Sequence, residues 1–198
     1  MFDAENLAIY NQNNGGIIMN LKTWTKTIFM VYRHLPRIID SIDKVFSARA
    51  INGGIMSGSA CSYNDVYNIT ENLINLSQRK IALINLKVLA SNAIKNIDKN
   101  LARILILRYI DGYSFKELSK HFNISERTAY RRIDEALSMA SMEILNQGYD
   151  KEKLENSLRN EKWLFHLCGD MDKEEFLKLD NNYLNRVISS YKKLSLAN

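Results

Sequence analysis

The sequence contains little of what would hold a small secreted domain or a metal site together. Cysteine occurs only at Cys61 and Cys168, and no CxxC pair or Cys/His spacing typical of a zinc site is present. One proline and eight glycines exclude collagen-like and proline-rich linker architectures. These absences favour two free thiols in a reducing compartment, and a fold that depends on an ordinary hydrophobic core.

Long apolar runs are missing as well. No stretch reaches the roughly 18 apolar residues of a membrane-spanning helix. The first residues contain neither the basic region nor the apolar region of a signal peptide. We therefore expect a cytoplasmic protein without a membrane partner.

The composition that remains is typical of one or two globular domains. The 198 residues are 46% hydrophobic and 25% charged. The formal net charge of +5 permits nucleic-acid binding but does not require it. Whether the protein is expected to bind nucleic acid therefore depends on where the basic residues lie.

Apolar spacing predicts an all-α protein, a helical bundle with a long central helix. We expect a flexible leader at 1–20 and a helical N-terminal or oligomerisation region at 21–98, with a break at Pro36 and a Gly/Ser linker at 52–62. The longest amphipathic segment is 64–97. Its predicted apolar stripe comprises Val66, Ile69, Leu73, Leu76, Ile81, Ile84, Val88 and Leu89. A helix this long must pack on the 21–49 helices or on a partner chain, so a homodimer through 64–97 is an alternative.

Residues 99–147 are expected to form three helices, over 101–110, 115–122 and 126 to about 147, the first of them ended by Asp111 and Gly112. Ser114 and Glu117 have the spacing of a capping box that starts the second helix. Asn123 can adopt the left-handed conformation of a tight turn, and Ser125 can cap the third helix. A short helix, a tight turn and a long capped helix are typical of a helix-turn-helix.

The third helix has one apolar and one basic face. At 100° per residue its inner face comprises Ala129, Ile133, Ala136, Leu137 and Ala140. Arg127 and Arg131 lie opposite, flanked by Thr128 and Tyr130. Because arginine can bind guanine bidentately in the major groove, we predict that these two arginines read bases. We expect backbone phosphates to be held by Lys116, Lys120 and Arg132.

This segment resembles region 4 of the sigma-70 class of transcription initiation factors. The resemblance rests on residues 107–112, 114–118 and 124–131. It implies a double-stranded DNA partner and RNA polymerase as a second partner. It also implies base contacts from Glu126, Arg127 and Arg131, and cap and phosphate roles for Ser125 and Thr128.

The long helix that leads into this module is similar to small phage and prophage regulators of low-GC Gram-positive bacteria, including ArpU-like late-gene activators. The preferred hypothesis is a sequence-specific DNA-binding transcription regulator. One alternative is a divergent sigma factor that acts only with core RNA polymerase, since 21–49 lacks a recognisable promoter-melting pattern. A second alternative is a helical adaptor that docks on polymerase without reading DNA.

No catalytic constellation or cofactor motif is present, so we expect neither an enzyme nor a metal site. His34, His121 and His166 are scattered, and the acidic residues near 170–175 lack the spacing of a calcium loop. Residues 150–198 are expected to form short helices over 151–160, over 163–167 running into Gly169, and over 173–194. We expect these helices to pack on the protein itself, with a partner surface as the alternative.

Overall fold

The computed structural model describes residues 21–56, 63–171 and 181–194, and these residues form an all-α protein without strands. A first helix covers 21–32 and is followed by α2 (Leu35–Met56) and α3 (Tyr63–Asn96). The helix-turn-helix region comprises α4 (Lys99–Leu105), the π-helical turn η1 (Ile106–Ile110), α5 (Phe115–Phe122) and α6 (Glu126–Asn146). The chain continues with α7 (Lys151–Ser157), α8 (Lys162–Met171) and α9 (Asn181–Leu194). The all-α prediction is therefore confirmed for the described residues.

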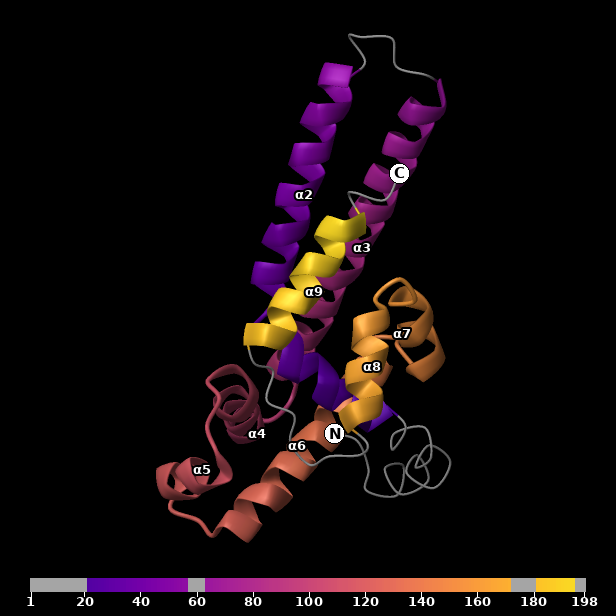
Figure 1. Cartoon of the computed structure of the whole chain (residues 1–198). Helices are drawn as coiled ribbons and strands as arrows, with labels where there is room; N and C mark the ends of the chain where they lie inside the picture. Colours follow the sequence, from indigo (N-terminus) through magenta and orange to yellow (C-terminus); the bar gives the residue numbers. More distant parts are fainter. Residues whose placement is uncertain (1–20, 57–62, 172–180, 195–198) are drawn as a thin grey trace.

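The helices α2 and α3 form a long antiparallel pair, and α9 lies along α2 (Figure 1). The helix-turn-helix region lies at the end of α3 that is away from the α2–α3 connection (Figure 1). There α6 packs against α3, α4 and α5. One cluster of buried apolar residues extends from Leu21 in the first helix to Tyr191 in α9. The module is therefore built onto the bundle through a shared core.

Pro36 marks the break between the first helix and α2, as predicted. The chain turns at residues 33 and 34, and Pro36 lies in the first turn of α2. Proline is tolerated there because the first backbone N–H groups of a helix have no intrahelical acceptor.

The predicted linker at 52–62 is too long at its start. Helix α2 continues through Asn52, Gly53 and Gly54 to Met56. Glycine in a helix costs only about 1 kcal/mol relative to alanine, so tertiary context can override its propensity. Residues 57–62 lie outside the described residues, as do the predicted leader at 1–20 and the start of the last predicted helix.

Helix α3 has the predicted extent, but its predicted stripe combines two faces. Leu76 and Leu89 are buried, whereas Ile81 and Val88 are 53% and 51% exposed. The buried face is made by Leu76, Leu83, Leu86, Leu89, Ala90 and Ala93. Apolar residues occur on both sides of α3, and periodicity alone does not identify which side meets α2 and α6.

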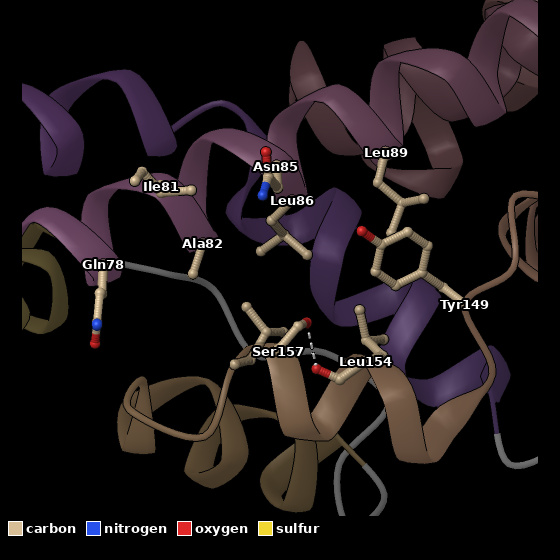
Figure 2. A pocket seen from close by; sticks show the side chains of 10 residues that line it. Gln78, Ile81, Ala82, Asn85, Leu86, Leu89, Tyr149, Leu154 and Ser157 are labelled. Carbon is tan, nitrogen blue, oxygen red and sulfur yellow. Dashed lines mark hydrogen bonds between the residues drawn. The ribbon is translucent and has the colours of Figure 1, made fainter.

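The exposed side of α3 borders a groove of about 180 Å³ between α3 and α7. Ile81 lies at its rim, and Leu86, Leu89, Tyr149 and Leu154 converge inside it (Figure 2). The groove is therefore apolar inside, where buried residues of α3 and α7 line it, and the exposed Ile81 lies beside it.

The C-terminal helices are joined to α3 by a buried polar cluster. Arg79 donates to both carboxylate oxygens of Glu161, at 2.8 and 3.2 Å. Glu161 also accepts hydrogen bonds from Trp163 Nε1 at 2.7 Å and from the Tyr191 hydroxyl at 2.5 Å. Burial, together with the Glu161 carboxylate, raises the pKa of Tyr191. Glu161 is fully buried, so its charge depends on these partners.

The end of α8 differs from the predicted one, whereas α9 ends at Leu194 as predicted. Helix α8 continues through Gly169 to Met171, although the sequence predicts an end at Gly169. Leu164, Leu167 and Met171 of this helix are buried in the common core. Their packing outweighs the low helix propensity of a single glycine.

Candidate nucleic-acid interface

Helix α5 starts with the predicted capping box. The Ser114 hydroxyl accepts from the Glu117 N–H at 3.2 Å, and Glu117 accepts from the Ser114 N–H at 2.7 Å. The backbone N–H and the hydroxyl of Ser114 both donate to the Glu117 carboxylate at 2.7 Å, and these two hydrogen bonds lower the pKa of Glu117. The cap fixes where α5 begins and therefore the direction in which its first residue, Phe115, projects.

The turn between α5 and α6 depends on Asn123. This residue has φ 51° and ψ 50°, the left-handed conformation predicted from the sequence. It is the single non-glycine residue with positive φ among the residues described. The half-buried Ile124 follows, and its N–H donates to the Ser119 carbonyl at 3.0 Å. The turn thus directs the chain from α5 into α6.

Helix α6 is capped by Ser125, whose hydroxyl accepts from the Thr128 N–H at 3.1 Å. The hydroxyls of Ser125 and Thr128 also lie 2.8 Å apart and share a hydrogen bond. The five residues predicted for the inner face are all buried, from Ala129 to Ala140. Ala129 lies in the core at 0% exposure, where its small side chain permits close packing.

The outer face of α6 presents the predicted basic residues to solvent. Glu126, Arg127 and Arg131 are exposed. Among the described residues, none of these three side chains has a hydrogen-bond or ion-pair partner. Asp134, one turn after Tyr130, instead pairs with Lys22 of the first helix at 2.5 Å. The two guanidiniums are therefore available to an external ligand, while Asp134 helps anchor α6.

Three further predicted phosphate contacts lie in different surroundings. Lys116 and Lys120 are exposed on α5. Arg132 is exposed on the side of α6 that faces α4, where it lines a hollow together with Asp98 and Glu135. The structure therefore groups Arg127 with Arg131 and places Arg132 beside carboxylates.

Helix α6 is held to the rest of the bundle at several points. The Ser141 hydroxyl donates to Thr25 Oγ1 at 2.9 Å, and both residues are buried. Trp24 Nε1 donates to Glu155 of α7 at 2.9 Å. The Ser141–Thr25 hydrogen bond and the Lys22–Asp134 pair fix α6 relative to the first helix, as required of an element that presents side chains to a ligand, while Trp24 joins the first helix to α7.

Sequence reasoning missed a stack of side chains beside the outer face of α6. The rings of Phe115 and Tyr130 are stacked, with centroids 3.5 Å apart and an interplanar angle of 18°. The Arg108 guanidinium also lies over the Phe115 ring, 4.4 Å from its centroid. No helical spacing connects residues on three separate elements, so no local pattern could have identified this stack.

The turn before α5 differs in detail from the predicted continuous helix. After α4 the chain forms η1, in which the Asp111 N–H donates to the Ile106 carbonyl at 3.0 Å. Gly112 then has φ 81°, and a Cβ there would lie 3.0 Å from an Arg33 nitrogen. The predicted stop at Asp111 and Gly112 is confirmed, and Arg108 of η1 is buried.

Two further features of other protein classes are missing from the described residues. These residues contain no helix that is both long and apolar enough to cross a membrane. Within the same residues, no group of three or more His, Cys, Asp and Glu side chains is placed to hold a metal ion.

Comparison with known proteins identifies the helix-turn-helix region. Residues 89–139 match the family model described as sigma-70, region 4. Searches of curated proteins and of solved structures returned no match. The matched residues include α4, η1, α5 and the N-terminal two thirds of α6, and so contain Arg127 and Arg131. The chain therefore carries a sigma-70 region 4-like helix-turn-helix.

Proposed function

We propose that this protein is a transcription regulator that binds double-stranded DNA sequence-specifically through α6. The observation that carries the proposal is the exposed pair Arg127 and Arg131 on a capped helix within a region 4-like module. The N-terminal part of the second helix of such a module enters the major groove, where arginine discriminates guanine from the other bases.

In this proposal each exposed side chain has a distinct role. Arg127 and Arg131 contact base edges, together with Glu126. Lys116 and Lys120 hold backbone phosphates, as do the hydroxyls of Ser125 and Thr128. Tyr130 contributes from the flank of α6. Arg132 is the weakest candidate for a phosphate contact because Asp98 and Glu135 line the same hollow.

The test is enrichment of sheared genomic DNA by the purified protein alone, followed by sequencing. We expect a discrete site that is lost with Arg127→Ala/Arg131→Ala. Arg159→Ala/Arg186→Ala is the matched control because it removes the same charge from exposed positions outside α6. Equal enrichment by the wild type and the Arg127→Ala/Arg131→Ala variant would contradict direct reading of DNA.

The two alternatives predict different results in the same experiment. A divergent sigma factor would enrich a site only when core RNA polymerase is added. A helical adaptor would co-purify with polymerase, and its activity would survive Arg131→Ala. The further assignment to phage or prophage regulators of the ArpU-like kind, acting in the cytoplasm, also belongs to this proposal and rests on sequence resemblance.

We also propose that a second copy of the chain binds the exposed side of α3. Tyr67, Ile74, Ile81 and Val88 recur at seven-residue intervals on this side and are 60%, 53%, 53% and 51% exposed. A seven-residue apolar repeat is the pattern that pairs helices in coiled coils. Such a dimer would supply two DNA-binding modules for two half-sites.

A further inference from the structure

The stacked residues Arg108, Phe115 and Tyr130 connect the module interior to the surface beside α6. Arg108 is 7% exposed, and its Nη1 donates to the Tyr113 carbonyl at 2.6 Å. Burial lowers the pKa of Arg108, but a guanidinium keeps its charge at neutral pH. The stack therefore starts from a fixed cation inside the module.

Phe115 connects the buried Arg108 to Tyr130 of α6. It is the first residue of α5, directly after the capping residue Ser114, and is half-buried. Its ring contacts both the Arg108 guanidinium, 4.4 Å from the ring centroid, and the stacked ring of Tyr130. The orientation of the Tyr130 ring is consequently set by residues of η1 and α5 as well as by its own helix.

Tyr130 is an exposed side chain whose ring is held in one orientation before any ligand binds. It is 47% exposed, although one face of its ring lies on Phe115. Within the described part of the chain its hydroxyl has no hydrogen-bond partner. It lies on the flank of α6 next to the beginning of α5, and the first helix of a helix-turn-helix is the one that crosses the DNA backbone.

We propose that Arg108 and Phe115 are positioning residues that hold Tyr130 so that its hydroxyl donates a hydrogen bond to one DNA backbone phosphate beside the groove entered by α6. This inference rests on the proposed DNA binding and adds a neutral phosphate contact to it. Tyrosine hydroxyls are ordinary donors to phosphate oxygens. Holding the ring before binding reduces the conformational entropy that is lost when the contact forms.

The first experiment removes only the hydroxyl. With a duplex that the wild type binds, Tyr130→Phe keeps the stack and is expected to raise Kd about tenfold, the effect of a hydrogen bond to a charged acceptor. The slope of log Kd against log salt stays unchanged because no cation is lost. Lys116→Ala, which removes a cation, reduces that slope and provides the contrast.

The second experiment locates the phosphate. Duplexes with a single neutral methylphosphonate are tested position by position. At one position the wild type loses affinity and Tyr130→Phe loses none further, because the contact is already absent. Other phosphates, such as those proposed for Lys116 and Lys120, should weaken the wild type and Tyr130→Phe equally. Unchanged affinity for Tyr130→Phe, or a difference between the two proteins that is not confined to one phosphate, would overturn the inference.

The third experiment separates positioning from folding. Phe115→Leu leaves the hydroxyl in place but removes the stacked ring, so sensitivity to that one methylphosphonate should fall. Phe115→Tyr keeps an aromatic ring at this position and should be as sensitive to that methylphosphonate as the wild type. Phe122→Leu removes another half-buried aromatic ring from α5 and should leave the sensitivity unchanged.

The controls also distinguish this inference from the proposed function. A wild type that binds no duplex overturns both. Binding that requires Arg127 and Arg131 but is indifferent to Tyr130→Phe overturns only the inference. Equal sensitivity to the methylphosphonate in Phe115→Leu and the wild type overturns the positioning role of Phe115.

Discussion

At the scale of single residues, Asn123 shows how one backbone conformation shapes the candidate interface. Its left-handed φ of 51° directs α5 into α6. Because glycine adopts this conformation without steric cost, Asn123→Gly should preserve stability within about 1 kcal/mol. Asn123→Ala should destabilise the protein by about 1–2 kcal/mol. Urea unfolding of the two variants checks this, and equal stabilities would contradict the argument.

Arg131 is the residue for which specificity and affinity can be separated. If it reads a base, Arg131→Ala should cost about 1–3 kcal/mol of binding and relax the preference at one position of the site. Lys116→Ala should weaken binding to all sequences to a similar extent. Binding measurements on a set of single-base variants distinguish these results, and an unchanged preference profile for Arg131→Ala would exclude base reading by this residue.

Because of Tyr109, the stability of the folded protein should depend on pH in the alkaline range. Burial raises the pKa of Tyr109 in the folded state to about 12, whereas an unfolded tyrosine has a pKa near 10. Its contribution to stability is therefore complete below pH 10 and is lost as the pH rises toward 12. The loss should be about 2–3 kcal/mol, from about 1.4 kcal/mol per pKa unit. Chemical unfolding at pH 9 to 12 measures it, and Tyr109→Phe should show a smaller decline than the wild type.

At the scale of the helices, the buried cluster around Glu161 decides whether α8 and α9 stay docked. Glu161→Ala leaves Arg79 buried without its carboxylate, which should destabilise the protein by about 3–5 kcal/mol. Hydrogen exchange should then increase first in α9, because Tyr191 loses its partner. Asp40→Asn is the control. It breaks the exposed Asp40–Lys44 pair on α2, which should contribute less than about 1 kcal/mol.

At the scale of the whole molecule, the exposed side of α3 predicts an oligomeric state. If a second copy binds there, the wild type should have twice the chain mass of 22.9 kDa, and Ile81→Glu should be monomeric. Ile51→Glu alters an equally accessible apolar residue on α2 and should remain dimeric. Light scattering coupled to gel filtration measures the mass, and a wild-type monomer would exclude the dimer.

Much of the helix-turn-helix could be predicted from the sequence because its determinants are local. The capping box at Ser114, the left-handed Asn123 and the cap at Ser125 each act within four residues, so spacing alone places α5 and α6. The inner and outer faces of α6 follow because its apolar and charged residues are cleanly separated around the helix. The similarity of 89–139 to sigma-70 region 4 agrees with the same local signals.

Tertiary structure decided what local signals leave open. Helix α3 has apolar residues on opposite sides, so only packing against α2 and α6 determined that Leu83 is buried and Ile81 exposed. Helix α8 continues through Gly169 because its buried residues compensate the low helix propensity of one glycine, and α2 continues through Gly53 and Gly54. The Arg79–Glu161 pair and the stack of Arg108, Phe115 and Tyr130 join residues from separate elements. The sequence thus determined where the DNA-binding module lies, because capping and turn chemistry act over a few residues. Only the fold decided how that module is held, because packing brings distant residues together.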